Sequence, residues 1–124
     1  MGNDGSNEPN WESGQLRELH SIGGWKLVTS IVETFARTRR TDYDALAASS
    51  AHRNYADIAL CAHRLKSTCS SVGGKRAARL CFELEMAGRE HSDGNLDATL
   101  GELAGELDRV EESLREYVAA KVVR

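Results

Sequence analysis

The chain has 124 residues, of which 28% are charged, and its formal net charge is −3. This length suits one domain with its own core. The negative charge argues against a general nucleic-acid-binding protein, whose domains are usually basic, and no apolar run approaches the roughly 20 residues that a membrane span needs. Three cysteines, without metal-type spacing, do not fit a secreted disulfide framework, so we expect a cytoplasmic protein.

The N-terminal part is predicted to be a tail followed by a short helix. Residues 1–10 are polar and rich in Gly and Asn, which favours a flexible tail or linker, and residues 11–124 would form the folded domain. Residues 11–20 predict a short helix. Gly23 and Gly24 are expected to interrupt the chain after it.

Two amphipathic helices are predicted between Trp25 and the middle of the chain. The first is expected to end near the basic residues Arg37, Arg39 and Arg40, and Thr41 would cap the second. The side chains expected to face inward are Leu27, Val28, Ile31, Val32 and Phe35 in the first helix, and Tyr43, Leu46, Ala47 and Ser50 in the second.

The next predicted helix displays a histidine on its outer face. Asn54 would cap its start, and Gly73 with Gly74 would end it. At about 100° per residue its apolar positions form one stripe, and His63 points away from that stripe. Lys66 lies one turn further along the same face as His63. The stripe consists of Ile58, Cys61, Ala62, Leu65, Cys69 and Val72.

Two more helices complete an all-α fold. The first would face inward with Ala77, Leu80, Cys81, Leu84 and either Ala87 or Gly88. Asp93 or Asn95 would cap the last and longest helix, whose acidic residues between Glu102 and Glu116 would form its solvent-exposed face. Its apolar residues alternate by four and three, as in a heptad seam: Leu96, Leu100, Leu103, Leu107, Val110, Leu114 and Tyr117. The sequence therefore predicts an antiparallel four-helix bundle with additional short N-terminal helices.

The residues around His63 resemble the motif of histidine-containing phosphotransfer (HPt) domains. In that family the pattern reads roughly A-H-x-L-K-G, then G-A, then L/C-x-x-L-E on the next helix. This chain differs from it at Ser67, where Gly is usual, at Gly74, where Ala is usual, and at Ala77, where a larger apolar residue is common. The matching segments are Ala62-His63-Arg64-Leu65-Lys66, Val72-Gly73-Gly74, Leu80-Cys81 and Leu84-Glu85.

The resemblance implies a phosphorelay intermediate. His63 would accept a phosphoryl group from the aspartyl phosphate of a receiver domain and pass it to another receiver aspartate, with Lys66 offsetting the phosphoryl charge. The receiver would supply Mg²⁺, so the chain would need no cofactor or metal of its own. The implied partners are response-regulator receiver domains and a hybrid histidine kinase, whose C-terminal domain this chain could be if it is not free-standing. We expect a monomer without autonomous kinase activity.

The small and exposed residues near His63 are expected to form part of the surface that meets the receiver. They are Ala59, Leu60, Arg64, Ser67 and Ser70. Glu85 is expected to hold helices together rather than to contact phosphate. A shared metal site at Cys61, His63 and Cys69 is disfavoured because the cysteines lie on the opposite side of the helix from the histidine.

Two alternatives keep a helical bundle without phosphotransfer. In the first, the side chain of Ser67 narrows the approach to His63, and the chain binds receivers without accepting phosphate. In the second, the leucine seam of the last helix drives dimerisation of a purely structural or protein-binding bundle.

Overall fold

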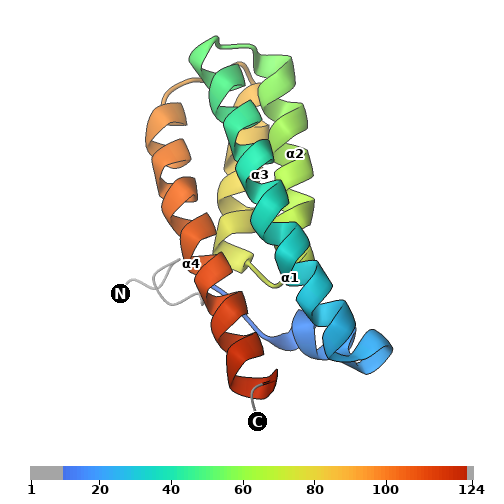
Figure 1. Ribbon diagram of the computed structural model, residues 1–124. Helices are drawn as coiled ribbons and strands as arrows, with labels where there is room; N and C mark the ends of the chain where they lie inside the picture. The colour runs from blue at the N-terminus through green and yellow to red at the C-terminus, as the bar shows by residue number, and fades with distance from the viewer. Residues whose placement is uncertain (1–9, 123–124) are drawn as a thin grey trace.

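A computed structural model describes residues 10–122, and this part of the chain contains four α-helices and no strand. The helices are α1 (Gly14–Ala51), α2 (Tyr55–Ser71), α3 (Lys75–Arg89) and α4 (Leu96–Val122). Successive helices run in opposite directions along a common axis (Figure 1). The predicted all-α antiparallel four-helix bundle is confirmed. The predicted tail at residues 1–10 lies, apart from Asn10, outside the described residues.

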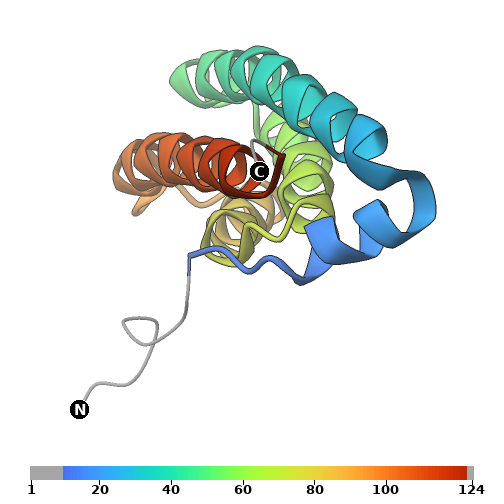
Figure 2. The same cartoon turned by 60° about the horizontal axis from the view of Figure 1, so that its bottom comes forward.

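Helix α1 is kinked where Gly23 and Gly24 were predicted to interrupt the chain, but it continues without a break past Thr41, where a further helix was predicted to begin. Its backbone leaves the helical region at Gly24, where φ is 69° and ψ is −167°, and the short N-terminal part folds back against one end of the bundle (Figure 2), where Leu16 is fully buried. The predicted cap at Thr41 is wrong, since Thr41 is an exposed residue inside the helix. Thr disfavours a helix interior by only about 0.7 kcal/mol or less. The burial of Phe35 and Leu46 on either side carries the helix through this segment.

The core lies between the four helices and follows the predicted apolar positions closely. In α4 the heptad positions from Leu96 to Leu114 are buried, and Tyr117 is half-buried. In α1 the predicted positions Val28, Val32 and Phe35 are buried. Helices α2 and α3 approach closely at Gly88, because a Cβ atom there would lie 2.7 Å from the backbone nitrogen of Ala59. A glycine is therefore needed where these two helices meet.

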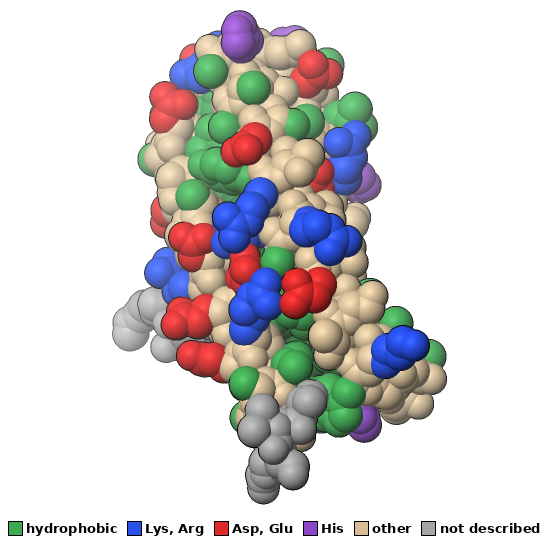
Figure 3. Space-filling model, viewed as in Figure 1, with side chains coloured by type: hydrophobic (Ala, Val, Ile, Leu, Met, Phe, Trp, Pro, Cys, Tyr) green, Lys and Arg blue, Asp and Glu red, His purple; other side chains and the backbone are tan. Residues whose placement is uncertain are grey.

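The prediction that the acidic residues of α4 are exposed to solvent is wrong for Glu106 and Glu111. Only 3% of the Glu106 side chain and 13% of the Glu111 side chain are exposed. Arg39 of α1 places its Nη2 atom 2.8 Å from Oε1 of Glu111 and 2.9 Å from Oδ1 of Asp108. Figure 3 shows basic and acidic side chains gathered along the side where α1 and α4 face the viewer. Glu111 and Asp108 thus connect α4 to α1, and Glu106 connects α4 to α3 through Arg76, whose Nη1 atom lies 3.8 Å from Oε2 of Glu106.

The segment before α1 is held against the turn between α2 and α3. The indole Nε1 of Trp11 donates a hydrogen bond to the Val72 carbonyl oxygen at 2.7 Å, and the Glu12 amide donates to the Gly73 carbonyl oxygen at 3.1 Å. The Trp11 ring also packs edge-on against Tyr117 of α4. These contacts place the N-terminal segment across one end of the bundle (Figure 2). None of the helices in the described part of the chain is long and apolar enough to span a membrane.

Candidate functional site

Helix α2 presents His63 to solvent because its opposite side is anchored in the core. Asn54 caps the helix as predicted, with its side-chain oxygen accepting a hydrogen bond from the Asp57 amide at 3.3 Å. Gly73, with φ of 87°, follows the end of the helix in a left-handed conformation. The predicted inner stripe is buried except at Cys61, which is half-buried. On the outer side, 57% of the His63 side chain is exposed.

The imidazole of His63 is held by a carboxylate from the neighbouring helix. Its Nδ1 atom lies 3.0 Å from Oε2 of Glu85 on α3. A carboxylate can only accept in such a bond, so Nδ1 carries the proton, and in the neutral ring the lone pair lies on Nε2. Glu85 is itself only 4% exposed. The contact therefore orients the ring and leaves the nucleophilic nitrogen on the edge that points away from Glu85.

Two cations share the same carboxylate. Nζ of Lys66 lies 2.9 Å from Oε1 of Glu85, and Nη2 of Arg89 lies 2.9 Å from Oε2, the oxygen that also accepts from His63. The hydrogen bond from Lys66 is the main cause that lowers the pKa of Glu85 from its ordinary value, while burial opposes it and the bonds from His63 and Arg89 assist. Glu85 is consequently ionised at neutral pH and accepts a hydrogen bond from His63 without taking its proton.

The cluster of His63, Lys66, Glu85 and Arg89 is only partly what the sequence predicted. Lys66 was expected beside His63, and the structure places it there through a shared partner rather than as a free ammonium group. Glu85 does bridge α2 and α3, as expected, but it also binds the histidine. Arg89 was not anticipated, although its i,i+4 spacing from Glu85 is a recognisable signal for an ion pair on a helix.

Most of the predicted partner surface is accessible around His63. Leu60 is 57% exposed, and Arg64, Ser67 and Ser70 are also exposed. Ala59 is half-buried, because it lies against Gly88 of α3. The side chain of Arg64 has no ion-pair partner among residues 10–122, so its charge is available to another molecule.

Phe82 of α3 extends the exposed surface, and sequence reasoning missed it. Its residue surface is 48% exposed, and Nζ of Lys66 lies 5.1 Å from the centre of its ring. This distance suits a cation–π interaction. Leu60 and Phe82 thus offer apolar contacts on the two helices that carry the histidine cluster, a composition typical of a protein-binding surface.

The cysteines do not assemble a metal centre with His63. Cys69 and Cys81 are buried between α2 and α3, and Cys61 is half-buried. Within residues 10–122 no group of three or more His, Cys, Asp or Glu side chains is placed to hold a metal ion.

Comparisons with known proteins agree with this arrangement. The family model for the Hpt domain matches residues 30–113, which include all four members of the histidine cluster. The crystal structure of histidine-containing phosphotransfer protein B (HptB) from Pseudomonas aeruginosa PAO1 is similar, with a TM-score of 0.83 over 92% of this chain and 98% of that chain. The two sequences are 18% identical, so this second likeness bears on the fold alone. No curated protein matches the sequence significantly.

Proposed function

Because this chain belongs to the Hpt family, it is a phosphotransfer domain of phosphorelays, and we propose that His63 carries the phosphoryl group. The group would arrive from the aspartyl phosphate of one receiver domain and leave to the aspartate of another. The observation that supports this most directly is an exposed imidazole whose Nδ1 is bonded to a buried carboxylate. A histidine that is merely a solvated surface residue needs no such partner.

The transfer step uses the orientation of the ring. The lone pair on Nε2 attacks the phosphorus atom, the N–P bond forms, and the bond from phosphorus to the aspartate oxygen breaks, which releases the carboxylate. The ring becomes an imidazolium whose Nδ1 proton remains hydrogen-bonded to Glu85, so the carboxylate stabilises the new positive charge. The reverse step returns the phosphoryl group to a second aspartate and restores the neutral ring.

Lys66 and Arg89 serve this step in two ways. They keep Glu85 ionised, and in this proposal the long side chain of Lys66 also offsets the charge on the phosphoryl oxygens that His63 would bear. Phosphoryl transfer depends mainly on positioning and on charge stabilisation, so a carrier needs little more than this. In this proposal Mg²⁺ and its acidic ligands belong to the receiver domain, and the chain acts as a carrier without kinase activity of its own.

The receiver would dock on the exposed surface around the histidine. Leu60, Arg64, Ser67 and Ser70 would form part of the contact, with Ala59 at its edge and Phe82 added from α3. We place this monomeric domain in the cytoplasm, either free-standing or as the C-terminal domain of a hybrid histidine kinase. Donor and acceptor receivers would use the same surface in turn, which requires modest affinity and fast release.

The proposal is tested by phosphotransfer from a panel of phosphorylated receiver domains to the wild type and to the variants His63→Gln and His91→Gln. His91 is exposed at the end of α3, outside the cluster, and provides the matched control. We expect an alkali-stable, acid-labile label on the wild type and on His91→Gln, and none on His63→Gln. Label on His63→Gln would assign the phosphoryl group to another residue.

One alternative follows from Ser67, which is exposed one turn from His63. If receivers bind the wild type but transfer no label, the chain is a docking module, and Ser67→Gly should then restore transfer. If no receiver binds at all, the protein is a structural bundle, and analytical ultracentrifugation should show a concentration-dependent dimer.

A further inference from the structure

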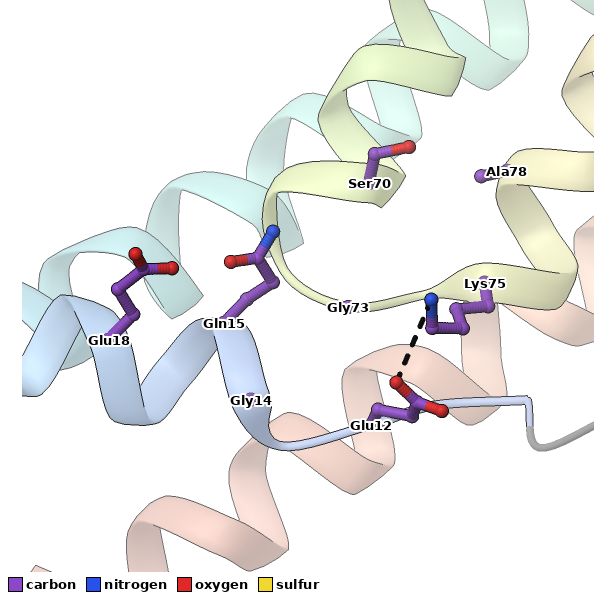
Figure 4. Close-up of a pocket in the computed structure, with 8 residues that line it drawn as sticks. All are labelled: Glu12, Gly14, Gln15, Glu18, Ser70, Gly73, Lys75 and Ala78. Carbon is purple, nitrogen blue, oxygen red and sulfur yellow. Dashed lines mark ion pairs between the residues drawn. The ribbon is translucent and has the colours of Figure 1, made fainter.

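A hollow of about 620 Å³ lies at the end of the same face that carries His63. The N-terminal segment contributes Glu12, Gln15 and Glu18 to its wall, α2 contributes Ser70, and α3 contributes Lys75 and Ala78. Figure 4 shows Gln15 projecting toward the end of α2 that carries Ser70 and Glu12 paired with Lys75 of α3, while Glu18 lies farther from the turn at Gly73. The hollow therefore joins the N-terminal segment to the turn between α2 and α3, more than 50 residues further along the sequence.

The hollow is continuous with the phosphotransfer surface. Ser70 lies seven residues after His63, which is two helical turns along the same side of α2 or about 10 Å. A typical protein interface covers about 800 Å² on each partner, which corresponds to a patch roughly 30 Å across. A receiver domain centred on His63 would consequently cover Ser70 and the hollow beyond it.

The charge of the hollow is negative. It contains two carboxylates, of Glu12 and Glu18, and one ammonium group, of Lys75, which lies 3.7 Å from Glu12. Glu18 has no ion-pair partner within the described part of the chain. Gln15 lies three residues before Glu18 on the same side of the short helix and adds an amide. The hollow can thus accept one further positive charge with polar partners beside it.

The walls of the hollow are held in place before any partner arrives. The Trp11 indole and the Glu12 amide donate hydrogen bonds to the carbonyl groups of Val72 and Gly73 at the α2–α3 turn. Gly73 is needed for this contact, because a Cβ atom at its position would overlap the Glu12 carbonyl oxygen. A preformed site loses less entropy on binding than a flexible one.

We propose that this hollow receives a lysine or arginine side chain of the receiver domain that exchanges phosphoryl groups with His63. The proposal rests on the proposed function and adds a determinant of partner choice to it. Glu18 is the main electrostatic contact, and Glu12 and Gln15 assist it. Receivers with an acidic or apolar residue at the corresponding position dock less well, because Glu18 is then left without a partner or faces a like charge.

The test compares Glu18→Lys with Glu102→Lys in transfer from a receiver that labels the wild type. Glu102 is exposed on α4, and both variants change the net charge of the chain equally. Transfer rates are measured against receiver concentration. For Glu18→Lys we expect the half-saturating concentration to rise about tenfold, with the maximal rate within about twofold of the wild type. Glu102→Lys should follow the wild type in both parameters.

A second experiment identifies which side chain of the receiver enters the hollow. Single lysine and arginine residues of the receiver are changed to glutamate, and one of these variants should recover transfer with Glu18→Lys while losing it with the wild type. The proposal that the hollow is a docking site would be overturned if the Glu18 and Glu102 variants had equal kinetics. It would also be overturned if no charge-reversed receiver variant restored transfer with Glu18→Lys. Failure of every receiver to label the wild type would instead overturn the role of His63, and this proposal with it.

Discussion

Replacing Glu85 with glutamine tests whether the buried carboxylate orients and stabilises His63 during transfer. The substitution keeps the size of the side chain and removes its charge. Glutamine can accept from Nδ1 through its oxygen, or it can donate to Nδ1 through its nitrogen after a flip. The flipped form favours the tautomer with the proton on Nε2, which removes the nucleophilic lone pair. Both outcomes slow the attack on phosphorus.

The size of the effect follows from the contact at 3.0 Å between Nδ1 and Oε2. A hydrogen bond to a charged group contributes about 1.5–3 kcal/mol, roughly twice as much as a neutral one. Lys66 and Arg89 already neutralise part of the carboxylate charge, so the lower part of that range applies. A loss of about 1.5 kcal/mol in the transition state corresponds to about a tenfold slower transfer, and flipping of the amide increases the loss further.

The assay is rapid-quench transfer from a phosphorylated receiver, together with ¹⁵N chemical shifts of the His63 ring, which report its tautomer. Glu83→Gln is the matched control, because Glu83 is exposed on the same helix and has no ion-pair partner among residues 10–122. Glu85→Gln should be at least about tenfold slower than Glu83→Gln. Equal rates, with the proton of the neutral ring still on Nδ1, would refute the role assigned to Glu85.

Further predictions concern stability. The pKa of Glu85 is lowered in the folded state, so its contribution to the free energy of unfolding is present above the unfolded-state pKa of about 4.3 and is lost as pH falls through the folded-state pKa. Urea unfolding should therefore show a gap between wild type and Glu85→Gln that is constant near pH 7 and narrows below about pH 4. Gly88→Ala should lower the free energy of unfolding by about 2 kcal/mol, because the added methyl group forces α2 and α3 apart. By contrast, Gly101→Ala should raise it by about 0.5–1 kcal/mol, since nothing lies within 4 Å of the new Cβ atom; a similar loss for both would contradict the packing argument. Gly73→Ala should release the N-terminal segment and shift the fluorescence of Trp11 toward that of an exposed indole; an unchanged spectrum would show that the turn accommodates a side chain.

The fold and the position of the histidine could be predicted from the sequence because both depend on local periodicity. In α2 the apolar stripe and His63 fall on opposite sides of a helix whatever that helix packs against. The heptad seam of α4 and the cap at Asn54 depend in the same way on residues within a few positions of each other. These features were predicted, and the structure contains them.

Helix boundaries and buried charges were less accessible to sequence reasoning. Thr41 follows a basic run and resembles a cap, but the packing of α1 against the bundle carries the helix past it. Glu111 resembles a solvent-exposed residue of α4 until Arg39 of α1 is placed beside it. Both errors arise because the free energy of a local signal is small compared with that of tertiary packing.

By itself, the sequence determined that His63, the proposed phosphoryl carrier, would be exposed on a helix. Only the tertiary structure decided what acts on that side chain. Glu85 is 22 residues from His63, and their contact depends on the axial register of α3 against α2. That register follows from the close approach at Gly88 and from the core, which are sums of many distant contacts. The acidic hollow likewise exists only because the chain before α1 returns to the α2–α3 turn, more than 50 residues further along the sequence.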